Sequence, residues 1–213
     1  LAIAIARTFG GELVGADSVQ VFRGFDIGSA KPSAAELGDI AHHLIDVTDP
    51  DAPLDAMDYA RLADDAIAAI HTRGHVPVIV GGTGLWIRAL VRGLVDLPAV
   101  DPALRSSLET DFARDPPATF ARLREIDPLS AERVHPNDAM RVVRALEVFE
   151  QTGQALGELR RAHALGADRY PTLFLVLDAP ASPPDARTEP RLAAMRTARR
   201  VDEGRGRRGR GPH

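Results

Sequence analysis

The sequence has no cysteine, a single lysine among its 26 basic residues, and only 5% aromatic residues. Without cysteine, disulfide frameworks, thiolate metal sites and cysteine nucleophiles are excluded. No stretch approaches the roughly 20 apolar residues that a helix needs to cross a bilayer, and no charged segment followed by an apolar core and a cleavage site is present. These absences predict a soluble cytoplasmic protein with no membrane partner.

The 213 residues, 45% of them hydrophobic, are enough for one globular domain with a small insertion. The formal net charge of -4 is unevenly distributed. Residues 187–213 are strongly basic and rich in Arg and Gly, whereas the preceding residues are acidic overall. Because such a composition buries little apolar surface, we expect a disordered basic tail there.

Helix and strand patterns alternate over the first 93 residues. The spacing of apolar residues predicts helices near 1–7, 55–73 and 85–92, and short apolar runs predict buried strands at 12–16 and 76–80. This alternation favours a parallel sheet with covering helices. The first helix begins without a capping residue, so we expect a segment that precedes Leu1.

Strand signals vanish between residues 101 and 166, where helical spacings are separated by Asp-Pro and His-Pro steps. An apolar run at 170–177 then predicts another buried strand. We therefore expect an α/β core at 1–98, a helical insertion at 99–166, a return to the core at 167–186, and the tail at 187–213.

Two loops that follow predicted strands carry candidate catalytic groups. Asp17-Ser18-Val19-Gln20 lies where open α/β sheets place ligands, and its carboxylate could accept a proton from an amine. The alternative is a structural Asx turn. In Gly81-Gly-Thr-Gly84, backbone amides and the Thr83 hydroxyl could meet an anion, although a tight turn that needs glycine for packing explains the motif equally well.

Basic side chains suggest a phosphate ligand. Lys31 ends a glycine-punctuated loop that could meet a polyphosphate. Arg141 and Arg144 are three residues apart on one predicted helix, and paired guanidinium groups suit phosphate. The alternative is a solvated helix face on which these arginines pair with Asp138 and Glu147.

Four ordered motifs together resemble the tRNA dimethylallyltransferases, also called tRNA isopentenyltransferases. They are Asp-Ser-x-Gln-Val-Phe-Arg-Gly-x-Asp-Ile-Gly-Ser-Ala-Lys-Pro at 17–32, His-His-Leu-Ile-Asp at 42–46, Gly-Gly-Thr-Gly-Leu at 81–85, and Asp-x-x-Arg-x-x-Arg-Ala-Leu-Glu-Val at 138–148. Four motifs in the family's order and spacing are far more specific than any one of them, and the resemblance extends to about residue 178.

The resemblance implies a P-loop NTPase-like parallel sheet with covering helices and an inserted all-helical subdomain. It also implies transfer of a dimethylallyl group from dimethylallyl diphosphate to the N6 amine of the adenosine 3′-adjacent to the anticodon, with Mg²⁺ as cofactor, the tRNA anticodon stem-loop as partner, and a monomeric enzyme. Asp17 corresponds to the general base and Thr83 to a second catalytic position. The implied tRNA-binding residues are Asp17, Ser18, Val19, Gln20, Thr83, Arg105, Met140, Arg141, Val142, Val143 and Arg144, and those implied for the diphosphate are Lys31, Gly82 and Arg141.

The sequence also departs from the family pattern. The Gly-x-Thr-x-x-Gly-Lys-[Ser/Thr] loop and the first strand, which the family places before the first helix, are absent from these 213 residues. We therefore expect little turnover from the chain by itself. A P-loop small-molecule kinase, and an inactive remnant that binds RNA non-specifically through its basic tail, remain the alternatives.

Overall fold

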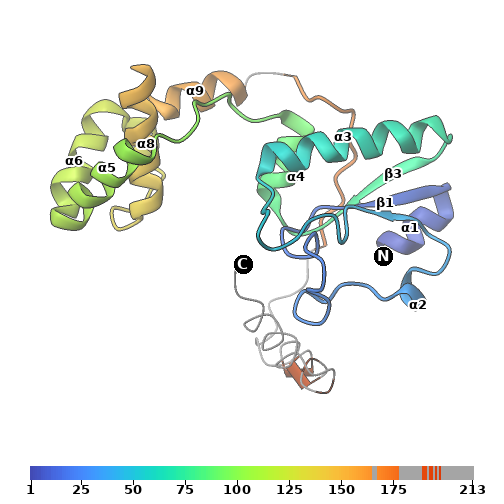
Figure 1. Cartoon of the computed structure of the whole chain (residues 1–213). Helices are drawn as coiled ribbons and strands as arrows, with labels where there is room; N and C mark the ends of the chain where they lie inside the picture. The colour runs from blue at the N-terminus through green and yellow to red at the C-terminus, as the bar shows by residue number, and fades with distance from the viewer. Residues whose placement is uncertain (165–166, 178–188, 191, 194, 196, 198–213) are drawn as a thin grey trace. The chain divides into compact units, whose positions relative to one another are not determined.

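The structure, a computed structural model, describes residues 1–164, 167–177, 189–190, 192–193, 195 and 197 (Figure 1). The chain divides into a core unit, Leu1–Gly93 with Arg169–His213, and a helical unit, Leu94–Asp168. Of the disordered tail expected at 187–213, the structure describes only residues 189–190, 192–193, 195 and 197, and these are helical; the rest lies outside the described residues. In the described part of the chain, no helix has both the length and the apolar character needed to cross a membrane.

The core unit contains the predicted parallel sheet. Its strands are β1 (Gly11–Gly15), β2 (His42–His43) and β3 (Val76–Val80), in the order β2-β1-β3. The central residue of β1, Leu13, is opposite His42 on one side and Val78 on the other. All five residues of β1 are buried, as a strand with neighbours on both sides should be.

Helices cover the sheet in the positions that the apolar spacing predicts. They are α1 (Ala2–Phe9), α3 (Ala56–Thr72) and α4 (Gly84–Arg92), with a short α2 (Ala34–Leu37) before β2. In Figure 1, α3 and α4 lie on one side of the strands and α1 on the other. The buried rings of Tyr59 on α3 and Trp86 on α4 stack with centroids 4.5 Å apart, which joins these two helices.

Two predictions about strands were wrong: that residues 170–177 form a strand, and that β3 is fully buried. Residues 171–177 form no strand, and their side chains are exposed, for example Leu173 at 84% and Val176 at 86%. The chain does return to the core unit, because Arg169 and Tyr170 both bind Asp64 on α3. An apolar run becomes a strand only when its backbone N–H and C=O groups pair with a sheet edge. Among the described residues β3 pairs with β1 alone, so one edge of β3 is open, but residues 171–177 do not pair with it.

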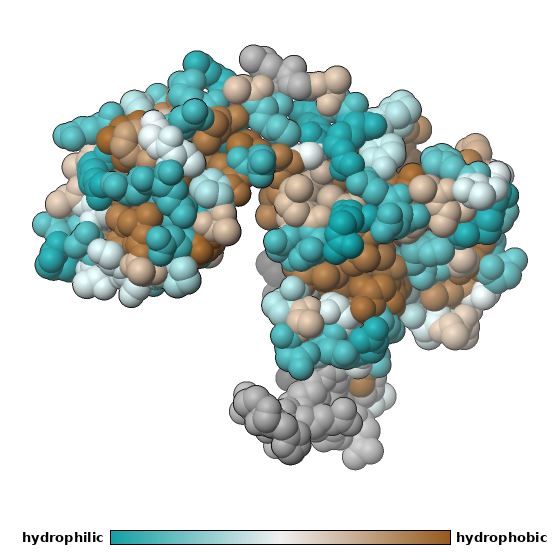
Figure 2. Space-filling model, turned by 45° about the horizontal axis from the view of Figure 1, so that its top comes forward, coloured by the Kyte–Doolittle hydropathy of each residue, from teal (hydrophilic) through white to brown (hydrophobic). Residues whose placement is uncertain are grey.

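β3 is also only half-buried, although its composition predicts a buried strand. Apolar surface is visible on the molecule (Figure 2), and the large exposed apolar side chains include Leu1, Phe9 and Val76. A strand with a neighbour on one side only keeps one edge open to solvent, which explains its exposure.

The helical unit confirms the expected all-helical segment. It consists of α5 (Pro102–Arg114), α6 (Pro116–Ile126), α7 (Pro128–Ala131), α8 (Ala139–Thr152) and α9 (Leu156–Ala164). The Asp-Pro steps start helices rather than only separating them: Asp101, Asp115 and Asp127 each cap the helix that the following proline begins. The core of the unit includes Leu108, Phe112, Leu123, Val142, Val143, Leu146 and Leu156.

Candidate active site

Asp17 lies just beyond the carboxyl end of β1 and is half-buried. Its Oδ1 accepts backbone N–H bonds from Val19 at 2.8 Å and from Gln20 at 3.1 Å. This is the Asx turn that the sequence offered as a structural alternative. The turn is also compatible with a catalytic role for Asp17. It fixes the carboxylate through Oδ1 and leaves Oδ2 as the oxygen that could take a proton.

Thr83 fastens the Asp17 loop to the next strand end. Its Oγ1 accepts the N–H of Ser18 at 3.0 Å, and its own N–H donates to the carbonyl of Ala16 at 3.1 Å. Thr83 is the residue before α4, so the turn after β3 and the turn after β1 are joined by side-chain and backbone bonds. The sequence motifs at 17–20 and 81–84 thus meet in space.

Gly81 allows this close approach. A Cβ atom built on Gly81 would lie 2.1 Å from the Ala16 carbonyl oxygen, whereas one on the neighbouring Gly82 would meet nothing within 4 Å. Gly81 therefore has the packing role that the sequence left open, and Gly82 faces open space.

We expect Gly81→Ala to destabilise the core unit by about 1–3 kcal/mol, because the backbone at Ala16 must move to admit the methyl group. Gly82→Ala is the matched control and should unfold like the wild type. Thermal unfolding measures the stability, and hydrogen exchange at the Ser18 amide reports the bond to Thr83. Equal behaviour of the two variants would contradict the packing role.

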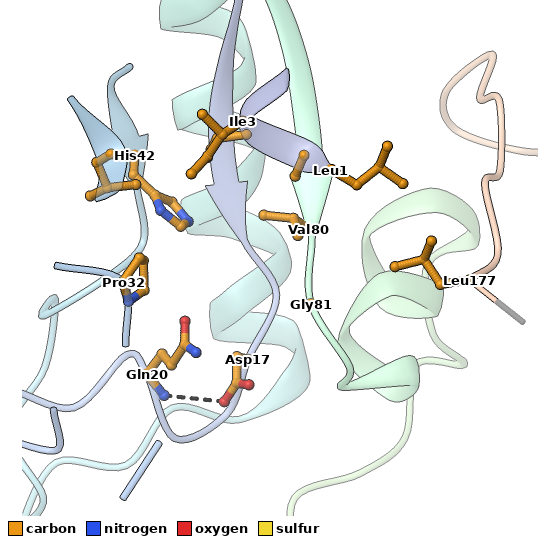
Figure 3. A pocket seen from close by; sticks show the side chains of 12 residues that line it. Leu1, Ile3, Asp17, Gln20, Pro32, His42, Val80, Gly81 and Leu177 are labelled. Atoms are coloured by element: carbon orange, nitrogen blue, oxygen red, sulfur yellow. Dashed lines mark hydrogen bonds between the residues drawn. The ribbon is translucent and has the colours of Figure 1, made fainter. Parts of the chain in front are cut away.

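A cavity of about 330 Å³ opens beside Asp17 and Gln20 (Figure 3). Most of its wall is apolar, and the polar groups that line it are the side chains of Asp17, Gln20 and His42. Its lining residues are Leu1, Ala2, Ile3, Leu13, Asp17, Gln20, Pro32, Leu37, His42, Val80, Gly81 and Leu177. Such a space suits a small branched hydrocarbon placed next to a carboxylate.

His42, on β2, is the polar group in this wall that sequence reasoning did not assign. Both of its ring nitrogens are buried, and neither has a hydrogen-bond partner in the described part of the chain. Burial, with a smaller contribution from His43, lowers the pKa of His42 to about 4. The cavity is therefore lined by a neutral imidazole at physiological pH.

Because the imidazole of His42 is neutral in the folded protein, we expect the stability of the fold to decrease in acid. Between about pH 6.5 and pH 4 the unfolded chain binds a proton at His42 that the folded chain does not, so stability falls as pH decreases through this window. We expect a loss of about 1–2 kcal/mol after solvent screening is considered. Urea unfolding across this window should show a smaller pH dependence for His42→Asn than for His71→Asn, an exposed control on α3. Identical profiles would contradict the prediction.

Lys31, assigned to the diphosphate on sequence grounds, is directed into the protein. Its side chain is 6% exposed, and its ammonium donates to the Phe22 carbonyl at 3.0 Å, to Asp26 at 2.8 Å and to Asp46 at 2.6 Å. Three acceptors take up the three N–H groups of a lysine. This geometry does not support a direct phosphate contact.

The assigned arginines lie in the helical unit, where Arg105 on α5 and Arg144 on α8 share one carboxylate oxygen of Glu147, at 2.6 and 2.8 Å. Glu147 is fully buried. Burial raises the pKa of Glu147, but the hydrogen bonds from Arg144 and Arg105 outweigh it and hold that pKa below its usual value. Arg141 is 69% exposed and pairs with Asp138. The pairing proposed as the structural alternative is thus present.

The remaining assigned residues on α8 differ in exposure. Met140 is 78% exposed. Val142 and Val143 are buried in the core of the helical unit, so their side chains do not offer a tRNA contact. The helical repeat explains this, since residues between two arginines spaced by three must face another side. Val19, in the Asp17 loop, is exposed.

A buried carboxylate outside the motifs also escaped the sequence analysis. Glu12 on β1 accepts bonds from Arg73 at 2.8 Å through two nitrogens, from His43 at 2.6 Å and from His75 at 2.7 Å. In the sequence, the sign of a buried, paired carboxylate is that Glu12 is a charged residue inside an otherwise apolar strand.

Comparison with known proteins gives a consistent result. The family model described as IPP transferase matches residues 20–210. The tRNA dimethylallyltransferase of Anaeromyxobacter dehalogenans strain 2CP-1 is 51% identical over 206 residues, which cover 96% of this chain and 67% of that protein. The tRNA dimethylallyltransferase 2 of Geotalea daltonii is 45% identical, over 92% of this chain and 60% of its own length.

Two solved structures are also similar. A eukaryotic dimethylallyltransferase acting on tRNA aligns with a TM-score of 0.77 and 29% identity, over 95% of this chain and 50% of that one. The tRNA delta(2)-isopentenylpyrophosphate transferase of Staphylococcus epidermidis aligns with a TM-score of 0.59 and 30% identity, over 95% and 66%.

The chain thus spans half to about two thirds of the length of these relatives. The family match covers most of its residues: it begins three residues after Asp17 and includes the Thr83 turn and the helical unit. With this sequence match, this sheet and these two turns in contact, the chain belongs to the IPP transferase family.

Proposed function

We propose that this chain carries the reaction site of an enzyme that transfers a dimethylallyl group from dimethylallyl diphosphate to the N6 amine of the adenosine 3′-adjacent to the anticodon in tRNA. The observation that carries the proposal is the carboxylate of Asp17, held by its own turn beside an apolar cavity. Its support is the family membership and the names of the relatives, which are tRNA dimethylallyltransferases.

The chemistry fits these residues. The bond between the allylic carbon and the diphosphate oxygen breaks, a bond forms between that carbon and N6, and diphosphate departs with the electron pair. An aromatic amine is a weak nucleophile because its lone pair is delocalised, so a carboxylate that accepts the N6 proton lowers the barrier. The apolar wall and the neutral His42 would not repel the positive charge that develops on the allylic carbon.

In this proposal, arginine side chains of the helical unit bind the phosphates of the tRNA. Arg141 is largely exposed, and Arg105 and Arg144 are 34% and 24% exposed beside Glu147. Exposed guanidinium groups bind backbone phosphates, while the target adenine must leave its stack to reach Asp17. Met140 extends this exposed surface, and the buried Val142 and Val143 are left out of the proposed contacts.

Mg²⁺ is part of the proposal as a partner of the diphosphate. Among the described residues, no group of three or more His, Asp or Glu side chains gathers in a way that could hold a metal ion. Mg²⁺ is commonly held by one or two protein groups together with the phosphates of the substrate, and none of the steps above depends on it. A cytoplasmic location and a monomeric enzyme complete the proposal, the first because tRNA is the substrate.

The test is a filter assay of labelled allyl transfer to an unmodified anticodon stem-loop, run beside an ATP consumption assay. The assayed protein should be this chain joined to those parts of the Anaeromyxobacter dehalogenans relative that it does not span, here named the extended protein. We expect transfer to the stem-loop with adenosine at the target position and none with guanosine. ATP consumption without transfer would favour a P-loop kinase, and RNA binding that ignores the target base would favour an inactive remnant.

A further inference from the structure

We propose that Lys31 is a positioning residue that orients Asp17 through Asp46 and Gln20. The inference rests on the proposed function for the reaction that Asp17 serves, but the contacts that carry it are independent of that function. The first of them is the ammonium group itself, which is buried and bonded to three acceptors. A lysine that bound diphosphate would need a free N–H, and this one has used all three.

The second observation is the backbone that these contacts hold. Ala30, Leu44 and Asp46 adopt left-handed conformations, with φ of 53°, 60° and 56°. Residues other than glycine rarely adopt this conformation, and it persists only where the surroundings impose it. Asp46 is held from both sides, because its carboxylate binds Lys31 and its N–H donates to the Gln20 carbonyl at 3.2 Å.

Gln20 connects the left-handed residues Ala30 and Asp46 to Asp17. Its side-chain amide donates to the carbonyls of Ser29 at 3.1 Å and Ala30 at 3.4 Å, and its backbone carbonyl accepts from Asp46, so Gln20 contacts two of the left-handed residues. Its backbone N–H donates to Asp17 Oδ1 at 3.1 Å. A continuous path of bonds therefore runs from Lys31 through Asp46 and Gln20 to Asp17.

Loss of the Lys31 ammonium should loosen the turn that holds Asp17. Without the ammonium, the Asp46 carboxylate loses its buried partner and the backbone at Asp46 is free to leave the left-handed conformation. The bond to the Gln20 carbonyl is then lost, and the turn that fixes Asp17 loosens. We expect the rate of the chemical step to fall while binding of the allyl diphosphate is retained.

The first experiment is hydrogen exchange on the 213-residue chain with Lys31→Met. We expect exchange at the Gln20 and Asp46 amides to accelerate about tenfold or more, with the amides of α3 unchanged. Asp46→Asn should give the same pattern, and Arg61→Met, which removes a solvent-exposed cation on α3, is the control. Unchanged exchange at Gln20 in both test variants would overturn the proposal, whether or not the protein transfers an allyl group.

The second experiment measures transfer kinetics in the extended protein as a double-mutant cycle. Lys31→Met and Asp46→Asn should each lower kcat about tenfold or more, with KM for dimethylallyl diphosphate within about twofold of wild type, and the double variant should be no worse than either single one. A selective rise in KM with kcat retained would assign Lys31 to the diphosphate and overturn the proposal. Additive losses would do the same, because they would show that the two residues act separately.

Discussion

Replacing Asp17 by alanine in the extended protein should lower the rate of allyl transfer by about 10²-fold or more, while affinity for the anticodon stem-loop changes little. The carboxylate is proposed to take a proton that leaves only as the new carbon–nitrogen bond forms. Its loss therefore affects the transition state more than the bound substrate. Single-turnover transfer and fluorescence anisotropy with labelled stem-loop measure the two quantities separately.

Asp17→Asn is the sharper variant. Asparagine keeps a side-chain oxygen that can accept the Val19 and Gln20 N–H groups, so the turn should remain, but it is not a base. We expect it to lose nearly as much activity as alanine with wild-type unfolding behaviour. An equal loss of affinity and rate, or near-normal activity of the asparagine variant, would assign Asp17 a structural role.

Replacing Glu12 by alanine should destabilise the core unit by about 1.5–3 kcal/mol, because Arg73 and two histidines lose a charged acceptor, although Arg73 and His75 are about half exposed and can be rehydrated. Glu12 accepts bonds from the C-terminal end of α3, from β2 and from the residue before β3, so one carboxylate joins four segments at the amino end of the sheet. Chemical unfolding at pH 7 measures the loss, with Asp65→Asn on the exposed face of α3 as control. A change below about 1 kcal/mol would contradict the role.

The same carboxylate predicts a second pH effect. The hydrogen bonds from Arg73, followed by those from the two histidines, hold the pKa of Glu12 far below its usual value although burial raises it. Its stabilisation is therefore complete above about pH 4.5 and is lost as pH falls toward the folded pKa. The stability difference between wild type and Glu12→Gln should narrow below about pH 4.5. A constant difference would show that packing, not charge, explains the effect.

Much of the fold was predictable because its signals are local. Apolar spacing identified α3 and α4, the glycine turn marked the end of β3, and the proline steps marked the helices of the insertion. The errors concern pairing. The apolar run at 171–177 has the composition of a strand, but strand formation depends on a neighbouring edge that composition does not specify.

The amino-acid sequence by itself determined the family, the order of the elements and the loop that bears Asp17, since four motifs and the periodicity of apolar residues are properties of the chain read in order. The tertiary structure alone decided which polar groups are already occupied. It directs Lys31 to Asp46, joins Arg105 and Arg144 through Glu147, and gathers two histidines and an arginine around Glu12. Apart from the Arg144–Glu147 pair within α8, these bonds connect residues 15 to 63 positions apart in sequence, and such partners become neighbours only when strands pair and helices pack.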